Sequence, residues 1–292
     1  MAGRTLTEPY LGRVVAVTGG ARGIGLATAR ALVRRGAAVA VGDLDGELAA
    51  AEAAALGGRA FGMALDVTDR SSFTAFLDEA ERRFDRLDVL VNNAGIMPLG
   101  ALTSEPDELT RRILDINVGG VLLGSKLAAG RMATRGGHII NIASGVGRIA
   151  QPRAVTYSAS KYAVVGATEA LRAELAADGI EVSCILPMVV NTQLGAGVPE
   201  IRGQRTLEPD EVAEAVLRCI RKPRFETWVP ASGLLASKVM NALPRTWADA
   251  LARGSGSGAL LANTDMNARD DYELRARGGS DDNRPDQPAA SA

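Results

Sequence analysis

The sequence predicts an α/β protein with a doubly wound parallel sheet, which helices cover on both faces to give three layers. Short apolar runs rich in valine and isoleucine alternate with longer segments of helical pattern along the chain. This alternation is typical of parallel sheets built from strand–helix–strand units. Glycine-rich or polar motifs directly follow several of the apolar runs. Ligands in such sheets bind beyond the carboxyl ends of the strands, so we expect one site at that edge.

The expected strands are short apolar runs that end at turn residues, a pattern typical of strands buried on both faces. They are residues 14–17, 37–41, 60–65, 87–91, 138–142 and 181–186. The segments between them are long enough for helices, and several stop at glycine. These helices are expected to end near Gly36, Leu56, Phe84, Thr134 and Asp178. Thr68 or Asp69 can cap the third helix. His138 begins a buried strand, so we expect it to be structural rather than catalytic.

The composition excludes several classes of function. The net charge of −1 gives no electrostatic case for binding nucleic acid or an anionic membrane. No uninterrupted apolar run approaches the roughly 18 residues of a membrane span. Residues 1–10 lack the apolar core of a secretory signal, so we expect a cytoplasmic protein. With one histidine and two cysteines, Cys184 and Cys219, we expect neither a metal site nor a disulfide framework.

A glycine-rich turn follows the first strand. The run from Thr18 to Gly25 has the spacing T-G-x-x-x-G-x-G and leads into a helix. A strand, a glycine turn and a helix N-terminus together form a cradle for the pyrophosphate of a dinucleotide. The second strand ends at Asp43, eighteen residues past Gly25, where an acidic residue meets the adenosine ribose hydroxyls. A carboxylate there repels the 2′-phosphate of NADP, which favours NAD.

Tyr157 and Lys161 are spaced four residues apart, with Ser144 upstream. On a helix such residues share a face, so the phenol and the ammonium point into the same space. A nearby cation favours the phenolate and is expected to lower the pKa of the tyrosine from its usual value of about 10. The Ser144 hydroxyl can hold a substrate oxygen within reach of the phenol. The three residues predict metal-free proton transfer to or from an alcohol or carbonyl oxygen.

With these motifs the chain strongly resembles the short-chain dehydrogenase/reductase family. The matching pieces come in the family order over roughly residues 10–230: they are Thr18 to Gly25, Asp66, Asn92 to Gly95, Asn117, Ser144, Tyr157 with Lys161, and Pro187 with Thr192. The resemblance implies a Rossmann-like fold and nicotinamide-dependent oxidation or reduction of an alcohol or carbonyl group. It also implies a homodimer or homotetramer. A basic residue such as Arg22 marks some NADP-preferring relatives, so NADP is the less favoured alternative.

The resemblance assigns roles residue by residue. The implied catalytic residues are Asn117, for a water-linked proton relay, Ser144, Tyr157 and Lys161. The implied dinucleotide-binding residues are Gly19, Arg22, Gly23, Ile24, Gly25, Asp43, Asp66, Val67, Asn93, Ala94, Gly95, Tyr157, Lys161, Pro187, Val190 and Thr192. Met188 departs from the family, which usually has glycine at this position. The candidates for the substrate pocket are apolar and predict a lipophilic secondary alcohol or ketone: Met97, Val146, Ile149, Met188, Val190 and Leu194.

We assign residues 1–252 to a single dehydrogenase domain, with a substrate lid at about residues 187–206. Glycine, serine, aspartate, asparagine and proline dominate from about Arg253. Such a composition buries little apolar surface, so residues 253–292 are expected to form a flexible tail. Two alternatives remain open for the function. One is a regulator that senses dinucleotides without turnover, and the other is a nucleotide-sugar epimerase or dehydratase, which shares the tyrosine–lysine pair.

Overall fold

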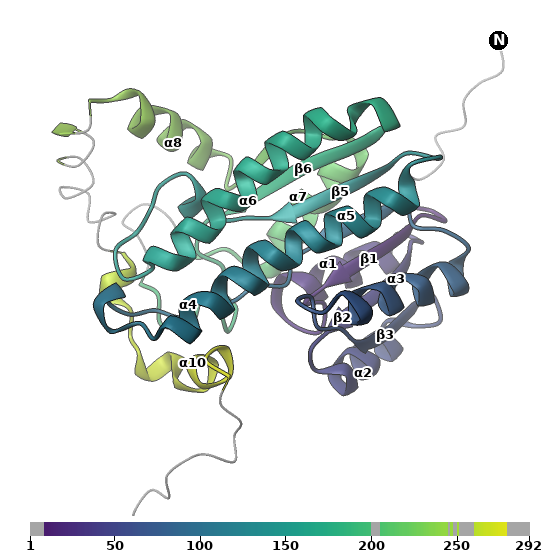
Figure 1. Cartoon of the computed structure of the whole chain (residues 1–292), viewed down its shortest axis with the longest axis horizontal. Helices are drawn as coiled ribbons and strands as arrows, with labels where there is room; N and C mark the ends of the chain where they lie inside the picture. The colour runs from purple at the N-terminus through teal and green to yellow at the C-terminus, as the bar shows by residue number, and fades with distance from the viewer. Residues whose placement is uncertain (1–8, 200–204, 245, 248–249, 251–259, 279–292) are drawn as a thin grey trace, which may run out of the picture.

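The structure is a computed structural model that describes residues 9–199, 205–244, 246–247, 250 and 260–278. Its centre is a parallel sheet with the strand order β3-β2-β1-β4-β5-β6-β7, which confirms the predicted doubly wound α/β fold (Figure 1). The strands are β1 (Val14–Thr18), β2 (Ala38–Asp43), β3 (Ala60–Ala64), β4 (Val89–Asn92), β5 (Gly137–Ile142), β6 (Ile180–Pro187) and β7 (Glu226–Val229).

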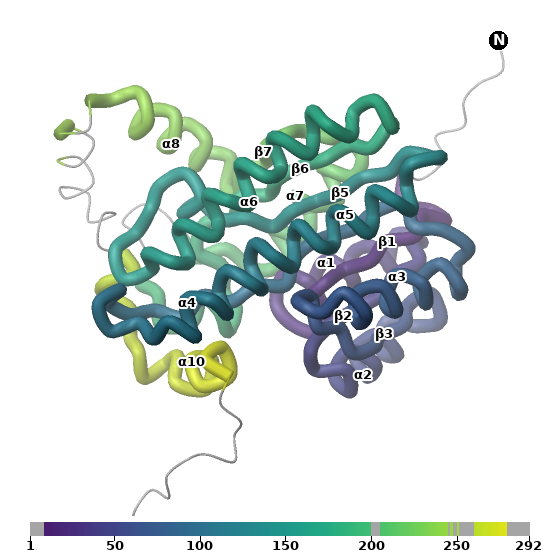
Figure 2. Tube along the Cα trace, viewed as in Figure 1, coloured from purple at the N-terminus to yellow at the C-terminus, as the bar shows by residue number. Residues whose placement is uncertain are grey.

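Helices cover both faces of the sheet and complete the three layers (Figures 1 and 2). One face carries α1 (Gly23–Val33), α2 (Gly46–Leu56) and α7 (Pro209–Arg221). The other face carries α3 (Arg70–Phe84), α5 (Gly120–Met132) and α6 (Val155–Glu174). Successive side chains of a strand serve opposite faces, so Val15 and Val17 pack with the first group and Ala16 with the second. Both faces are therefore buried, which explains the continuous apolar runs.

The strand order reverses between β1 and β4, and this reversal opens a crevice at the carboxyl ends of the strands. The Thr18 hydroxyl, at the end of β1, accepts hydrogen bonds of 3.0 Å from the backbone amides of Asn93 and Ala94, which follow β4. Beneath the crevice Asn92 Nδ2 donates to Asn141 Oδ1 at 2.9 Å, within the sheet. These bonds fix the two turns that border the site.

His138 is buried in β5, as expected of a structural residue. Its Nε2 lies 2.8 Å from the hydroxyl oxygen of Ser183 on the neighbouring strand β6. Burial lowers the pKa of His138 to about 4, and the positive charge of Arg13 acts in the same direction. The imidazole is therefore neutral at physiological pH and serves the sheet rather than the crevice.

A long helical segment, Asp107–Met132, is the one stretch among the described residues that is long and apolar enough to span a membrane by length and composition. It consists of α4 (Asp107–Leu114), the π-helical turn η2 (Asp115–Gly119) and α5. Val121, Ala128 and Met132 of this segment belong to the hydrophobic core. Packing against the sheet thus accounts for its hydropathy.

Three elements between Pro187 and Ala242 are absent from the sequence-based prediction. Helix α7 begins with a capping box, in which Glu208 and Glu211 each bond the other's backbone, and Pro209 occupies the first turn. The run Glu208-Pro209-Asp210-Glu211 was a recognisable start signal for this helix. Strand β7 pairs in parallel with β6 and so extends the sheet by one strand. After β7 the chain forms α8 (Ser232–Ala242).

The structure contradicts the expected flexibility of the tail over residues 260–278. This segment contains the 3-10 turns η6 (Leu261–Asn263) and η7 (Asn267–Arg269) and the helix α10 (Asp270–Ala276), which lies near α4 in Figure 1. Leu261, Arg269 and Ala276 are buried, Arg269 completely. Composition failed here because one buried ion pair and a few apolar side chains anchor a mostly polar segment. Residues 253–259 and 279–292, and residues 200–204 of the expected lid, lie outside the described residues.

Candidate active site

A cavity of about 1770 Å³ lies at the carboxyl ends of the strands. Ordinary small-molecule sites measure about 300–1,000 Å³, so this cavity has room for a dinucleotide together with a second molecule. Most of the residues predicted for the site line it: Gly19, Arg22, Gly23, Ile24, Asp43, Asp66, Val67, Asn93, Ala94, Gly95, Ser144, Tyr157, Lys161, Pro187, Val190 and Thr192. Gly25 and Asn117 are not in the lining, but Gly25 lies against Gly19 and Asn117 is bonded to Ile96, both of which line the cavity.

The glycine turn is built for close backbone approach. Gly19 has φ of +61°, and a Cβ there would lie 2.9 Å from the Cα of Ala94. A Cβ on Gly25 would lie 2.2 Å from the carbonyl oxygen of Gly19, so this glycine lets α1 pack against the turn. Gly23 has φ of +52°, and a Cβ placed on this glycine would lie 3.2 Å from the methyl carbon of Thr192. A side chain on Gly23 would fill the space between the helix and the lid.

The N-terminus of α1 can accept an anion. Its N-cap residue, Arg22, makes no side-chain cap to the described helix, so the first-turn amides face the cavity without that partner. Backbone amides and the helix dipole at such a position favour a phosphate group. The small residues of the turn and the uncapped helix start therefore fit the pyrophosphate of a dinucleotide.

Asp43 and Arg22 lie at the same end of the cavity but have different partners. Asp43, at the end of β2, accepts a hydrogen bond from Ala21 N at 3.1 Å and another from Asp45 N at 3.2 Å. Arg22 forms an ion pair of 2.8 Å with Asp45. The Asp43 carboxylate thus has no cationic side chain bonded to it among the described residues. The Arg22 charge is directed to Asp45, the N-cap of α2.

Asp66 and Val67 lie beyond β3. The Asp66 carboxylate accepts hydrogen bonds from the Thr68 amide at 2.8 Å and from the Thr68 hydroxyl at 2.7 Å. Of the two predicted caps of α3, Asp69 rather than Thr68 is the N-cap residue. Val67 is buried against Gly120. A Cβ placed on that glycine would lie 2.8 Å from Val67 Cγ2. Both residues line the cavity, at the position that the family resemblance gives to the adenine ring.

Tyr157 and Lys161 are buried side chains of α6, and both line the cavity. The Lys161 Nζ lies 5.7 Å from the centre of the Tyr157 ring and donates a 3.0 Å hydrogen bond to the Ile142 carbonyl oxygen at the end of β5. Ser144 follows β5 and lines the same cavity, where its side chain acts to lower the pKa of Tyr157. The helix and the strand end thus bring the three predicted residues together.

The expected direction of the tyrosine shift is wrong for the structure described. Burial raises the pKa of Tyr157 to about 12, although the hydrogen bond with Ser144 and the positive charge of Arg269 act to lower it. Burial also lowers the pKa of Lys161 to about 8. Removing a phenolate from water costs more than one hydrogen bond and one cation offset. The cation that acts on the phenol here is Arg269, which the sequence-based prediction did not include.

Asn117 lies in the π-helical turn η2 and is fully buried. Its Oδ1 accepts from the Ile96 amide at 2.8 Å, and its Nδ2 donates to the Ile96 carbonyl at 2.9 Å and to the Ser160 hydroxyl at 3.0 Å. A Cβ on Gly95 would lie 3.1 Å from Asn117 Oδ1 and 3.5 Å from Lys161 Nζ. Gly95 therefore keeps the space between the asparagine and the lysine open.

The substrate end of the cavity combines the predicted residues Met97, Val146 and Leu194 with residues that sequence reasoning missed. Met97, Leu99, Ala154, Tyr157 and Leu261 form one apolar cluster, and Val146, Leu194, Val198 and Met266 pack against it. Tyr272 and Leu260 also line the cavity. The only sequence signal for the lining residues near the C-terminus was the four-residue spacing of Arg269, Glu273 and Arg277.

Met188 lies where the family usually has glycine. Its thioether covers Gly145, since a Cβ on that glycine would lie 2.4 Å from the Met188 sulfur. The methionine also packs with the cluster that contains Trp228 and lines the cavity with Ile149. Among the described residues no group of three or more His, Cys, Asp or Glu could hold a metal ion, and Cys184 and Cys219 are free and buried.

The comparisons with known proteins agree with this geometry. The family model described as short chain dehydrogenase matches residues 13–202. The chain is 41% identical over 223 residues to the cis-4-hydroxycyclohexanecarboxylate dehydrogenase of Sinomonas cyclohexanicum. This match covers 72% of this chain and 89% of the relative. The chain is also 41% identical over 212 residues to the 3-alpha-(or 20-beta)-hydroxysteroid dehydrogenase of Mycobacterium bovis, with coverage of 71% and 82%.

A solved structure is similar over most of the fold. It is a short chain dehydrogenase/reductase from Burkholderia phymatum in complex with NAD, with a TM-score of 0.73 and 25% identity. The match covers 81% of this chain and 95% of that one. Together with the glycine turn and the tyrosine–lysine pair in one cavity, these similarities establish that the chain belongs to the short-chain dehydrogenase family.

Proposed function

We propose that this oxidoreductase interconverts a lipophilic secondary alcohol and its ketone with NAD, using Tyr157 as acid and base. The observation that carries the proposal is the position of the Tyr157 phenol, in the same cavity as the glycine turn and Ser144. When bound, the nicotinamide ring supplies or accepts the hydride. The chain itself has to hold the reacting oxygen and move its proton.

In the direction of reduction, Tyr157 donates its proton to the carbonyl oxygen of the substrate. A pKa of about 12 keeps the phenol protonated at neutral pH, so the described state is ready for this step. The Ser144 hydroxyl donates a second hydrogen bond to the same oxygen and stabilises the charge that develops on it. In oxidation the proton of the alcohol passes to the Tyr157 oxygen instead.

Lys161 and Asn117 support this transfer. With a pKa lowered to about 8, the Lys161 amine is largely protonated at neutral pH and places a positive charge next to the phenol. Asn117 is held on the Ile96 backbone across the space that Gly95 leaves open, which is a suitable position for a water that links the lysine to solvent. Lys161 in addition fits hydrogen bonding to the nicotinamide ribose.

The preference for NAD rests on Asp43. Its carboxylate lines the cavity at the end of β2, where it can accept hydrogen bonds from ribose hydroxyls and repels a 2′-phosphate. Arg22, the residue that favours NADP in some relatives, is paired with Asp45. The same proposal takes the active form to be a cytoplasmic homodimer or homotetramer, on the strength of the family resemblance.

The lipophilic substrate class rests on the apolar cluster beside Tyr157. The two relatives are named as dehydrogenases of a hydroxycyclohexanecarboxylate and of hydroxysteroids. These names support cyclic secondary alcohols as the first compounds to test. The experiment follows nicotinamide absorbance with a panel of cyclic and open-chain alcohols and ketones, using NAD and NADP in parallel. We expect turnover of at least one lipophilic member with NAD. Tight dinucleotide binding without any turnover would favour the sensing regulator instead.

A further inference from the structure

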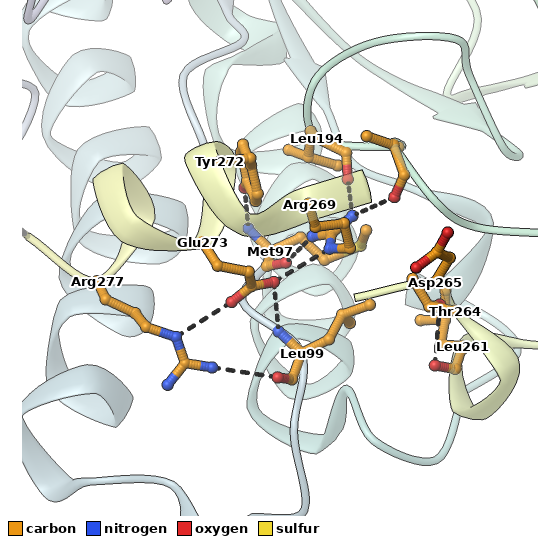
Figure 3. A network of polar contacts seen from close by, with 12 residues as sticks. Met97, Leu99, Leu194, Leu261, Thr264, Asp265, Arg269, Tyr272, Glu273 and Arg277 are labelled. Atoms are coloured by element: carbon orange, nitrogen blue, oxygen red, sulfur yellow. Dashed lines mark hydrogen bonds and ion pairs between the residues drawn. The ribbon is translucent and has the colours of Figure 1, made fainter. Parts of the chain in front are cut away.

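Residues 260–278 return to the cavity from the far end of the chain. The family match ends at residue 202, so this segment is an addition to the matched part of the fold. It lies beside the lid and α4, and Figure 3 shows its polar contacts with the loop that follows β4. Leu260, Leu261, Tyr272 and Ala276 all line the cavity.

Arg269 is the anchor of the segment. Its side chain is fully buried, and its Nη1 donates to the carbonyl oxygens of Leu194 at 2.6 Å and Ala196 at 3.0 Å. Its Nη2 donates to the Met97 carbonyl oxygen at 2.7 Å, and its Nε to Glu273 at 3.1 Å (Figure 3). A buried charge is tolerated only when it is paired and hydrogen-bonded, and these contacts meet both conditions. One guanidinium thus joins the lid, the loop after β4 and the C-terminal segment.

The loop after β4 is held by three further residues of the segment, Tyr272, Glu273 and Arg277. The Tyr272 hydroxyl accepts a 2.7 Å hydrogen bond from the Met97 amide, and the Glu273 carboxylate accepts one of 3.2 Å from the Leu99 amide. Arg277 bonds both Glu273 and the Leu99 carbonyl oxygen. The Tyr272 ring lies under the Arg269 guanidinium, 4.9 Å from ring centre to Cζ. The Tyr272 side chain is therefore held both at its hydroxyl and at the face of its ring.

The C-terminal end of the segment is bonded to two borders of the cavity, α4 and the lid. Arg112 of α4 donates to the Ala276 carbonyl oxygen at 3.0 Å, and Arg275 donates to the Gln193 side chain of the lid at 2.9 Å. Leu261 packs in the same apolar cluster as Tyr157 and Met97. The segment thus forms a surface directly beside the proposed proton donor.

We propose that residues 260–278 form the outer wall of the substrate site, in which Leu261 and Tyr272 determine specificity and Arg269 is the positioning residue that holds them. The proposal rests on the proposed function, because it deepens the substrate class of the same site. Leu261 and Tyr272 present an aliphatic chain and an aromatic ring, which suit the uncharged body of a cyclic alcohol or ketone. Arg269 also contributes a positive charge that favours the Tyr157 phenolate.

The first experiment measures substrate selectivity. Tyr272→Ala and Leu261→Ala are assayed with a series of cyclic secondary alcohols of increasing size, and kcat/KM is compared for the largest and the smallest. We expect the ratio to shift toward the large alcohols by about tenfold or more, since removing a wall side chain admits bulk that it excluded. Tyr162→Ala is the matched control, because Tyr162 is exposed on α6. An unchanged ratio in both wall variants overturns the proposal.

The second experiment tests the positioning role without relying on turnover. Tyr272→Phe keeps the ring but removes the acceptor of the Met97 amide, so hydrogen exchange at that amide should accelerate. Arg269→Lys, whose ammonium cannot make all the bonds of the guanidinium, should accelerate exchange at both Met97 and Leu99. Arg269→Gln removes the positive charge and should shift the alkaline limb of the oxidation pH profile upward. Unchanged exchange in Tyr272→Phe, which retains the buried ion pair and is expected to fold, contradicts the wall contacts. Failure of the wild type to turn over any alcohol rejects the proposed function, whereas wild-type turnover with unchanged selectivity in the variants rejects the wall alone.

Discussion

The Nζ of Lys161 lies 5.7 Å from the centre of the Tyr157 ring, and its hydrogen bond goes to the Ile142 carbonyl oxygen. The lysine is therefore a neighbouring charge rather than a direct partner of the phenol oxygen in this structure. Ser144, which lines the same cavity, is the hydroxyl that acts on the phenol and lowers its pKa. This arrangement leaves the tyrosine oxygen as the group that meets the substrate, and it leads to the first prediction.

Tyr157→Phe should abolish most of the turnover and leave dinucleotide binding intact. Removing a general acid or base typically costs about a hundredfold to ten-thousandfold in rate. The ring itself remains in its apolar cluster, so the fold should not change. Steady-state kinetics and a fluorescence titration with the dinucleotide check the two halves of the prediction. Activity within a few-fold of the wild type would exclude Tyr157 as the proton carrier.

Ser144→Ala should move the pH dependence as well as the rate. The hydrogen bond from Ser144 lowers the pKa of Tyr157, so its loss raises that pKa further above its usual value. The phenolate is then harder to form, and the alkaline limb of kcat/KM for alcohol oxidation should shift to higher pH. A pH–rate profile of both proteins, measured at saturating dinucleotide, checks this. A lower rate with an unmoved limb would restrict Ser144 to orienting the substrate.

Asp43→Asn should relax the preference between the two dinucleotides. The amide oxygen of asparagine can still accept the hydrogen bond from Ala21, whereas the negative charge that repels a 2′-phosphate is gone. We expect kcat/KM for NADP relative to NAD to rise by about tenfold, which corresponds to roughly 1.4 kcal/mol. Asp45→Asn, which removes the partner of Arg22 instead, is the companion variant. A wild-type enzyme that already prefers NADP would contradict the role of Asp43.

His138→Gln should make the protein less sensitive to acid. The pKa of His138 is lowered from 6.5 to about 4 in the folded state. Its stabilising contribution is therefore complete above about pH 6.5 and is lost as the pH falls through about 4. The wild type should lose up to about 3 kcal/mol more stability than the variant over this range. Urea unfolding at several pH values measures the difference, and parallel curves for the two proteins would place the acid sensitivity elsewhere.

Glu273→Ala should destabilise the protein by about 3–5 kcal/mol, because it leaves the Arg269 guanidinium buried without its carboxylate partner. The Leu99 amide loses its acceptor in the same variant. Chemical denaturation followed by circular dichroism gives the free energy of unfolding. Glu174→Ala, at an exposed position on α6, serves as the control and should lie within about 0.5 kcal/mol of the wild type. Equal stability of the two variants would show that the segment is dispensable for the fold.

The part of the fold that the sequence predicted is the part in which each element carries a local signal. The strands β1 to β6 are apolar runs, and the chemistry follows them in short motifs, so both could be placed without the structure. Helix α7 carries a capping box, but it lies beyond Thr192, where the family motifs end, and the sequence-based prediction did not include it. The wall was missed for a physical reason. Its stability comes from contacts of Arg269 with backbone atoms about 70 to 170 residues away, and no local pattern encodes such contacts.

The ionisation of Tyr157 shows a second limit of sequence reasoning. The spacing of Tyr157 and Lys161 correctly places the two side chains in one cavity. It does not report how far the phenol is removed from water, and that burial decides the direction of the pKa. Residue spacing gives proximity, whereas the balance between desolvation and charge depends on everything packed around the pair.

The bonds from Arg269 to the lid and to the β4 loop all end on main-chain oxygens, namely those of Leu194, Ala196 and Met97. The side chains at these three positions are consequently not part of these hydrogen bonds, although those of Met97 and Leu194 pack in the apolar cluster that contains Leu261. Variants at Met97 and Leu194 can change the shape of the pocket while the same main-chain bonds to Arg269 hold residues 260–278 in place. The enzyme thereby offers a ready scaffold for library design, in which selectivity is varied without disturbing either the anchor or the hydride chemistry.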